Sequence, residues 1–164
     1  MLKTEKERIV CNKVICSSSI LIIVVILCAL SFSCNSSGAG NGSYYINGTI
    51  DGTPYNKDGI TIGAVAFGWT QISAADSQSD IDSTQNIWQL AVYGTTTGTY
   101  NSIMDTVVYS IDSSTFYSGQ GPDIFIVITS LGDVIEGTFE GTVTHSVAFT
   151  THSVSGSFRV QKVF

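Results

Sequence analysis

Two histidines, His145 and His152, are the side chains best suited to acid–base or metal chemistry near neutral pH. They flank a predicted hairpin turn about Ala148 and Phe149, which would place them opposite each other on neighbouring strands. Directly opposed residues of an antiparallel pair have Cβ atoms roughly 4.5–5.5 Å apart, close enough to share one ion. Because zinc normally takes at least three protein ligands and no third candidate lies nearby in sequence, the histidines are weak metal candidates and we expect no cofactor.

Three aspartates, Asp76, Asp80 and Asp82, share one polar segment and could offer carboxylate oxygens to calcium. An EF-hand loop counted from Asp80 needs glycine at its sixth position and glutamate at its twelfth. The chain has Gln85 and Ala91 at these positions. The default interpretation is therefore solvated loop charge, with a looser calcium site as the alternative.

Two glutamates, Glu136 and Glu140, could suggest the carboxylate pair of a glycosidase. Four strand residues separate them by roughly 13 Å at the usual strand rise. Glycosidase pairs lie within about 10 Å of each other, so this pair fits neither mechanism. The sequence also has no Gly-x-Ser-x-Gly elbow and no glycine-rich phosphate loop ahead of a helix. We therefore predict no catalytic residues and no enzyme activity.

The four cysteines occupy positions 11, 16, 28 and 34, so the rest of the chain has neither disulfides nor thiol chemistry. Four basic residues precede a strongly apolar run at 20–30, which is the layout of an export signal. The residues Ser31, Phe32, Ser33 and Cys34 resemble a bacterial lipobox, although it lacks the usual leucine three residues before the cysteine. We predict cleavage before Cys34 and acylation of its thiol. An uncleaved transmembrane helix over 14–32 is the alternative.

Composition divides the chain into a signal peptide (1–33), an acylated cysteine with a Gly/Ser/Asn tether (34–43) and one domain (44–164). From Cys34 onward there are 3 basic and 11 acidic residues, which makes nucleic-acid binding improbable. Asn35 after the cysteine favours transfer to the outer membrane. Because the tether lacks the acidic cluster that resembles a surface-export signal, we expect the periplasmic face rather than the cell surface.

Strand signals dominate the predicted domain, and we expect a single antiparallel β-sandwich with a small closed barrel as the alternative. No segment keeps the apolar periodicity of a helix, and 74–86 is predicted to be a loop and 94–100 a turn. Two segments, 86–93 and 123–130, are apolar on both faces and should be central strands. The other predicted strands cover 44–51, 59–67, 106–111, 134–143 and 153–160.

Alternation in the last two predicted strands assigns an inward face to Phe139, Gly141, Gly156 and Phe158. Folding the strands together about the turn predicts that Phe139 lies opposite Phe158 and Gly141 opposite Gly156. The same register predicts the opposition of the two histidines. A slip of one residue would turn the apolar face outward, so the pattern constrains the pairing.

Aromatic residues are frequent enough to line a platform for a sugar or lipid, although in all-β domains most aromatics are core. Trp88 lies in the most apolar predicted strand, and we assign it to the core. Trp69, which we place beside the acidic loop, is the better candidate for exposure.

Short strand and turn patterns carry a family resemblance: Ile-Asp-Gly-Thr-Pro-Tyr at 50–55, Ile-Glu-Gly-Thr-Phe at 135–139 and Gly-Ser-Phe-Arg-Val at 156–160. With these patterns the chain resembles a family of small uncharacterised all-β lipoproteins of Bacteroidota. The resemblance implies an all-β domain in the cell envelope and assigns no catalytic residues.

The function predicted from these observations is that of a lipid-anchored binding or structural module in the cell envelope. Its partners would be the membrane, through the lipid, and a protein, glycan or lipid ligand. A lipocalin-like carrier of a small apolar ligand is one alternative, and it would need an apolar interior cavity of several hundred Å³. A hydrolase is the least favoured alternative.

Overall fold

The computed structural model describes residues 44–163, so the predicted signal peptide, tether and acylated Cys34 lie outside the described residues. Within this range the predicted all-β, antiparallel class is confirmed. No helix of the described range is long and apolar enough to cross a membrane. The elements are β1 (Tyr45–Ile50), β2 (Thr53–Lys57), β3 (Ile60–Ala66), β4 (Trp69–Ala75), α2 (Gln78–Ser83), β5 (Ile87–Val92), β6 (Gly98–Tyr100), β7 (Thr106–Ser110), β8 (Phe116–Gln120), β9 (Ile124–Leu131), β10 (Val134–His145) and β11 (Thr151–Gln161).

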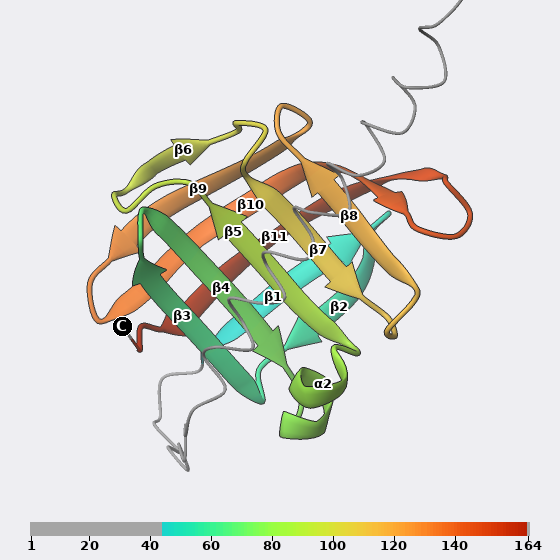
Figure 1. Cartoon of the computed structure of the whole chain (residues 1–164), viewed down its shortest axis with the longest axis horizontal. Coiled ribbons are helices and arrows are strands. Elements are labelled where there is room, and N and C mark those ends of the chain that lie inside the picture. The colour runs from blue at the N-terminus through green and yellow to red at the C-terminus, as the bar shows by residue number, and fades with distance from the viewer. Residues whose placement is uncertain (1–43, 164) are drawn as a thin grey trace, which may run out of the picture. The chain divides into compact units, whose positions relative to one another are not determined.

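All eleven strands belong to one sheet with the main order β2-β1-β11-β10-β8-β7-β5-β4-β3, while β9 pairs with β10 and β6 pairs with β9. In Figure 1, β3, β4, β5, β7 and β8 form a front layer whose strands cross those of a back layer. A parallel bridge between Gly63 and Lys162 links the last strand of the front layer to β11. The sheet is thus layered like a sandwich and nearly closed into a barrel.

The corner between the layers lies in β10, which pairs with β9 as far as Gly141 and then with β8 from Thr144. Gly141 has φ +142°, a conformation that residues with a side chain rarely adopt. A Cβ at this position would also collide with the carbonyl oxygen of Asp123. Glycine therefore lets β10 change partners without leaving the sheet.

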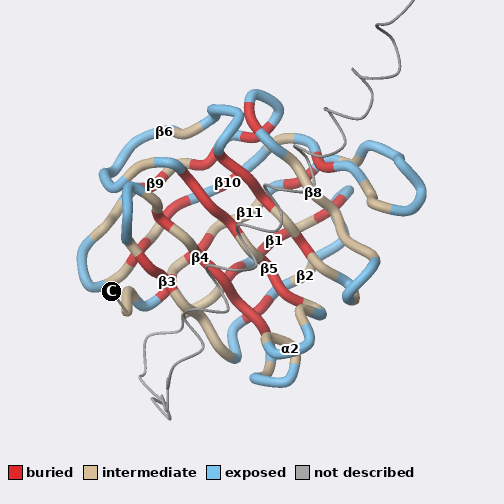
Figure 2. The backbone as a smooth tube through the Cα atoms, viewed as in Figure 1, coloured by how far each residue is buried: buried red, intermediate tan, exposed pale blue. Residues whose placement is uncertain are grey.

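Aromatic rings fill the space between the layers, and Trp88, Phe139 and Phe158 are buried with the aliphatic side chains around them. The ring of Trp88 lies 5.3 Å from that of Phe139 and 4.8 Å from that of Tyr109. Buried positions follow the middle of β4, β5 and β11, and exposed positions gather at the connections (Figure 2). Burying each large apolar side chain contributes about 1.5–3 kcal/mol, so this core supplies a large share of the stability. The assignment of Trp88 to the core is confirmed.

The inward and outward faces predicted for β10 and β11 are confirmed, but the predicted register is wrong by two residues. Phe139 lies opposite Gly156, and Phe158 lies opposite Gly137. A Cβ on either glycine would collide with the ring of the phenylalanine opposite, so each ring occupies the space that glycine leaves empty. A shift of two residues preserves the alternation, which is why the pattern alone could not distinguish the two registers.

Several local predictions also differ from the structure. The segment 74–86 is not a continuous loop, because β4 extends to Ala75 and α2 follows, begun by the side chain of Ser77 as its N-cap. The predicted turn at 94–100 ends in the short strand β6, and β2, β4 and β8 were not predicted as strands. Strand β5 is central, as predicted, but β9 pairs on one side only with the three-residue β6 and exposes Phe125.

Candidate functional site

The tyrosine–histidine cluster consists of Tyr117, His145 and His152, which come from β8, β10 and β11. The ring of Tyr117 lies 4.9 Å from His145 and 5.2 Å from His152, edge to face in both cases. The two imidazoles lie 6.4 Å apart, and all three side chains are half-buried. The histidines are therefore brought together by a shared aromatic neighbour. They are not opposed, since Val143 is the residue opposite His152.

His152 is fixed from both sides of its ring. Its Nδ1 lies 2.7 Å from a carboxylate oxygen of Asp51, and its Nε2 lies 2.7 Å from the hydroxyl of Thr150. Asp51 also accepts a hydrogen bond from the backbone N–H of Ser153 at 2.8 Å. The bond with His152 and then that from Ser153 lower the pKa of Asp51 below its ordinary value, because both stabilise the ionised carboxylate.

Asp51 owes its place to the predicted Asp-Gly turn between β1 and β2. Asp51 has φ +49° and Gly52 φ +77°, the left-handed conformations that a type I′ hairpin turn requires. The backbone N–H of Asp51 donates to the carbonyl of Ser153 at 2.9 Å. The local Asp-Gly sequence thus places the carboxylate of Asp51 next to β11, about a hundred residues further along the chain.

The connection between β10 and β11, residues 146–150, is the hairpin tip next to this cluster. The Nδ1 atom of His145 accepts from the backbone N–H groups of Ala148, at 3.0 Å, and Val147, at 3.3 Å. Outward from this ring, Val147 is 62% exposed and Phe149 is 80% exposed. Phe149 has φ +55°, a strained conformation for a bulky residue. The hairpin tip is thus apolar at its surface and hydrogen-bonded beneath.

Thr150, His152 and Asp51 form a hydroxyl–imidazole–carboxylate relay in the order used by serine hydrolases. Such enzymes also need N–H groups aimed at a developing oxyanion. At the hairpin tip, the N–H groups of Val147 and Ala148 donate to His145 Nδ1, and the N–H of Phe149 donates to the His145 carbonyl. The relay can therefore orient the imidazole, but the tip uses these three amides in its own turn.

Metal binding requires a third ligand beside the weak candidates His145 and His152. Within residues 44–163, no group of three or more His, Cys, Asp or Glu side chains is placed to hold a metal ion. Both nitrogens of His152 are engaged with Asp51 and Thr150, and Nδ1 of His145 accepts from the backbone. The described residues therefore offer no metal site built on this pair.

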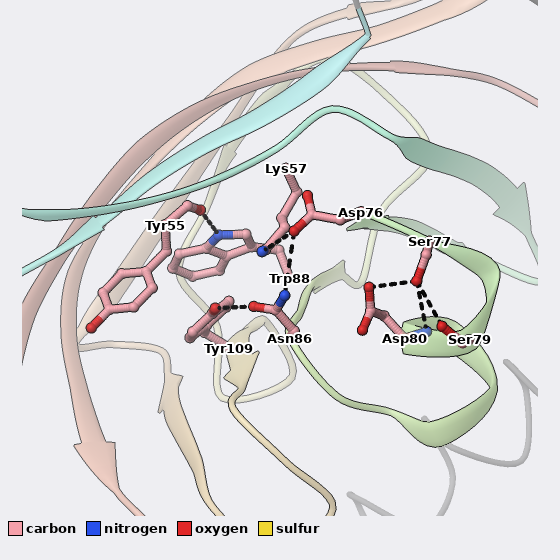
Figure 3. Close-up of polar contacts among 9 residues, drawn as sticks. All are labelled: Tyr55, Lys57, Asp76, Ser77, Ser79, Asp80, Asn86, Trp88 and Tyr109. Atoms are coloured by element: carbon pink, nitrogen blue, oxygen red, sulfur yellow. Dashed lines mark hydrogen bonds and ion pairs between the residues drawn. The ribbon is translucent and has the colours of Figure 1, made fainter.

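A second polar network closes the domain between β2 and the front layer (Figure 3). The ammonium of the buried Lys57 lies 2.6 Å from Asp76, and Asp76 accepts from the amide of Asn86 at 3.3 Å. The Asn86 carbonyl in turn accepts from the Tyr109 hydroxyl at 2.7 Å. Burial raises the pKa of Tyr109 to about 12, and nearby Tyr55 adds to the shift.

The remaining members of the predicted calcium loop are also engaged. The side chain of Asp80 accepts from the hydroxyl of Ser77 at 2.7 Å, and Asp82 accepts from the amide of Gln78 at 2.8 Å. These bonds start α2 and brace its first turn, while Asp76 faces Lys57 instead. The three carboxylates therefore serve separate local contacts and do not converge on one point.

The aromatic edge consists of Phe67, Trp69 and Tyr93, at the β3–β4 turn and the adjacent end of β5. Phe67 has φ +53° and is 98% exposed, and the rings of Trp69 and Tyr93 pack edge to face at 5.2 Å. Trp69 is partly exposed, but it lies at the far end of β4 from Asp76, not beside the acidic segment. The pattern Phe-Gly between two alternating strands was the signal that could have identified this turn.

Asp105 supports the aromatic edge, and this structural role was not predicted from the sequence. It is 1% exposed, and its carboxylate accepts from the backbone N–H groups of Tyr93, at 2.8 Å, and Ser102, at 2.6 Å. The hydroxyl of Thr70 donates to the carbonyl of Gly94 at 2.7 Å beside it. The end of β5 is therefore fixed by buried polar contacts.

Comparison with protein-family models, curated proteins and solved structures gave no match to this chain. The similarity to Bacteroidota lipoproteins accordingly stays a prediction. The two surfaces that stand out on geometry alone are the hairpin tip with its cluster and the aromatic edge.

Proposed function

We propose that this chain is a lipid-anchored binding module of the cell envelope, held by Cys34 at the periplasmic face of the outer membrane, with no enzymatic activity. Its hairpin tip contacts a protein or glycan partner. The observation that carries this proposal is Phe149, an 80% exposed phenylalanine in a left-handed backbone conformation at the end of a rigid hairpin. The lipoprotein part of the proposal rests on the lipobox-like sequence and on the resemblance to the Bacteroidota family.

The placement of Phe149 is unfavourable for the isolated domain on two grounds. A left-handed conformation costs an ordinary residue roughly 1–2 kcal/mol, and the ring makes little contact with the core. Asparagine or glycine would serve the turn better. Exposed residues that weaken a fold are concentrated at binding surfaces, which supports a contact role.

The hydrogen bonds beneath the hairpin tip favour a partner that binds in one defined orientation. The backbone of the turn is bonded to His145, and β11 is bonded through Ser153 to Asp51. A preordered loop loses little conformational entropy on binding, which increases affinity. Val147 and Phe149 would supply apolar contact area, and His152 and Thr150 would supply polar contacts at its border.

The filled interior favours surface binding over the lipocalin-like alternative. Trp88, Phe139 and Phe158 occupy the space between the layers, and glycines of facing strands lie directly against their rings. A carrier needs an apolar cavity in that space. The engaged amides of the tip likewise favour binding over hydrolysis at Thr150.

Photo-crosslinking in intact envelopes tests the proposed contact surface. A benzoylphenylalanine placed at position 149 of the full chain should yield one dominant cross-linked species. The same probe at position 125, a partly exposed phenylalanine of β9, is the matched control and should not yield it. An excess of unlabelled wild-type domain should compete away the product, whereas excess F149N should not. Equal cross-linking at both positions would contradict the proposal.

Mass spectrometry of the protein purified from membranes tests the anchor separately. The mature chain should begin at Cys34 and carry the mass of a diacylglycerol and an amide-linked acyl group. Cys34→Ser should leave an unprocessed precursor. A mature protein that retains residues 1–33 would show the uncleaved alternative.

Reactivity of Thr150 tests the hydrolase alternative. A fluorophosphonate probe attacks hydroxyls that a neighbouring imidazole activates. We expect no more labelling of the wild-type protein than of T150V. Specific, His152-dependent labelling of Thr150 would replace binding with catalysis as the better assignment.

A further inference from the structure

We propose that Lys57 and Asn86 form an intramolecular isopeptide bond, in which the side-chain nitrogen of Lys57 replaces the amide nitrogen of Asn86. Asp76, which is hydrogen-bonded to both side chains, accepts and returns the proton that this reaction requires. The bond joins the end of β2 to the start of β5. The modification takes place once within the chain, so it depends neither on the proposed lipid anchor nor on the partner of the hairpin tip.

The fold brings these three side chains together from three separate segments. Lys57 is the last residue of β2, Asp76 directly follows β4, and Asn86 directly precedes β5. Because β4 and β5 are antiparallel neighbours, Asp76 and Asn86 lie at the same end of this pair. Gly59 packs against the backbone of Asp76, where a Cβ would collide with the carbonyl oxygen. The β2–β3 connection can therefore approach closely enough to present Lys57.

The nucleophile of the reaction is the amine of Lys57. Lys57 is 6% exposed, and its ammonium lies 2.6 Å from the Oδ2 atom of Asp76. Transfer of one proton along this hydrogen bond leaves a neutral amine, which is the form of lysine that attacks a carbonyl carbon. The side chain of Asp76 is 49% exposed, so the displaced ammonia has a path to solvent.

The electrophile is the side-chain amide of Asn86, which is held at both of its polar atoms. Its Nδ2 atom donates to the same Oδ2 atom of Asp76 at 3.3 Å, and its Oδ1 atom accepts from the hydroxyl of Tyr109 at 2.7 Å (Figure 3). Burial raises the pKa of Tyr109 to about 12, so this hydroxyl keeps its proton. It is therefore placed to stabilise the negative charge that develops on Oδ1 during the attack.

The arrangement contains more than an ion pair requires. The amine nitrogen of Lys57 and the amide nitrogen of Asn86 share one carboxylate oxygen, so they lie within about 6 Å of each other. Asn86 has φ +52°, which asparagine tolerates, and its backbone N–H donates to the carbonyl of Ile111 at 3.3 Å. Groups held together in this way react as an intramolecular pair, which lowers the entropic barrier.

The atoms of the reaction balance without an added reactant. The Lys57 ammonium gives one proton to Asp76, and the nitrogen lone pair forms a bond to Cγ of Asn86. A second proton passes from this nitrogen through Asp76 to Nδ2, the bond between Cγ and Nδ2 breaks, and ammonia leaves. The ammonia takes up the first proton, so one ammonium ion is released for each isopeptide bond. The chain becomes about 17 Da lighter, and nothing is oxidised or reduced.

The bond would secure a strand that has few other contacts in the sheet. Strand β2 lies at one end of the main strand order, and within the described residues it pairs only with β1. No cysteine occurs after Cys34, so a disulfide within the domain cannot hold this edge. An isopeptide bond between positions 57 and 86 would close a covalent loop and restrict the unfolded chain in the same way as a disulfide.

Trypsin digestion of the denatured full-length protein tests the bond. The basic residues after Cys34 are Lys57, Arg159 and Lys162. Trypsin does not cut after an acylated lysine, so the wild type should stay intact at Lys57. K57R keeps the positive charge but cannot form the bond, and it should be cut after position 57. K162R is the matched control and should remain uncut at Lys57, as in the wild type.

Mass spectrometry of the same samples identifies the bond. After the mass difference between lysine and arginine is subtracted, the wild type should be about 17 Da lighter than K57R. Fragmentation should show residues 57 and 86 in one branched peptide. D76N should reduce the cross-linked fraction at least tenfold, because it removes the proton acceptor, and Y109F should reduce the fraction formed after a short pulse of synthesis.

Three results would overturn the inference. The first is wild-type protein that trypsin cuts after Lys57 and that shows no loss of mass. The second is a loss of about 18 Da, which is the mass of water and would place the bond between Lys57 and Asp76. The third is full cross-linking in D76N, which would remove Asp76 from the reaction. The wild-type measurements use the denatured chain, so they decide the question even where a variant fails to fold.

Discussion

Two turns of this domain present a phenylalanine in a left-handed backbone conformation, and their surroundings differ. Phe67 of the β3–β4 turn adjoins the Trp69–Tyr93 pair, in which the backbone N–H of Tyr93 donates to the buried Asp105. Phe149 of the β10–β11 turn adjoins imidazoles, a hydroxyl and a carboxylate. An exposed phenylalanine with a strained backbone thus lies beside aromatic rings in one turn and beside a polar network in the other.

This difference indicates what each end can recognise. Aromatic rings without fixed polar groups offer apolar contact area with little preference for one orientation of a partner. Oriented donors and acceptors around an apolar tip suit a partner with a defined shape, because hydrogen bonds are lost when the geometry is wrong. The comparison therefore predicts that changes at one end leave the contact at the other end intact.

The largest expected effect comes from Asp105. Asp105→Ala removes the buried acceptor of the N–H groups of Tyr93 and Ser102, and each such loss costs about 1–3 kcal/mol. We expect a destabilisation of about 3 kcal/mol in urea unfolding. Cross-linking at position 149 should persist under conditions where the variant is folded. Loss of the cross-link from the folded variant would show that the two surfaces are not independent.

The second-largest effect on stability is expected at Tyr109, which belongs to the polar network of Asn86, Asp76 and Lys57. Its pKa is raised to about 12 in the folded chain, above the ordinary value of about 10. The unfolded chain therefore loses this proton first, so the contribution is fully present below pH 10 and disappears as the pH rises towards 12. Unfolding followed across this window should show a fall in stability that Y109F lacks. Tyrosinate absorbance of the folded protein would contradict this if every tyrosine ionised by pH 10.

Smaller effects, opposite in sign, are expected when the strained phenylalanines are replaced. F67N creates an Asn-Gly pair, the preferred type I′ turn, and should stabilise the domain by about 0.5–1 kcal/mol. F149N should stabilise it by a similar amount. Thermal unfolding measures both. A variant that gains stability and loses its own contact distinguishes a binding residue from a folding residue, whereas a loss of stability in either variant would mean that the ring packs against the domain.

The smallest effect is expected at Asp51. Because its pKa is lowered in the folded chain, its contribution is present above the ordinary value of about 3.9 and is lost as the pH falls through the folded value. D51N keeps a residue that tolerates the turn and removes the charge. The protection factor of the Ser153 amide, which compares its exchange rate with the intrinsic rate at the same pH, should fall in the wild type on acidification and should be low at all pH values in D51N. Identical exchange in the two proteins would remove Asp51 from the support of the tip.

The sequence specified those features that depend on neighbouring residues. Alternation along β10 and β11 identified the inward faces, and the Asp-Gly pair identified the first turn, because both are local properties of the backbone. The register of the same hairpin depended on how the rings of Phe139 and Phe158 fit against glycines of the opposite strand, which alternation does not encode.

The candidate site was harder to predict from the sequence because its contacts join residues that lie far apart in the chain. His145 and His152 were recognisable by type, and their proximity was predicted for the wrong reason. The bonds of His152 to Asp51 and of Tyr93 to Asp105 depend on which strands become neighbours in the folded sheet. Phe67 and Phe149 could have been identified as unusual turn residues, but only the structure shows that they stand exposed.

The pairing of β1 with β11 also determines when the domain can fold. These strands join residues more than a hundred positions apart, as in the contact between Thr49 and Ser155. Contacts of such separation make folding slow. In a chain exported from its N-terminus, β1 would reach the far side of the membrane first and its partner last. Folding would then be completed only after translocation, and the unpaired first hairpin would be exposed to envelope chaperones in the interval.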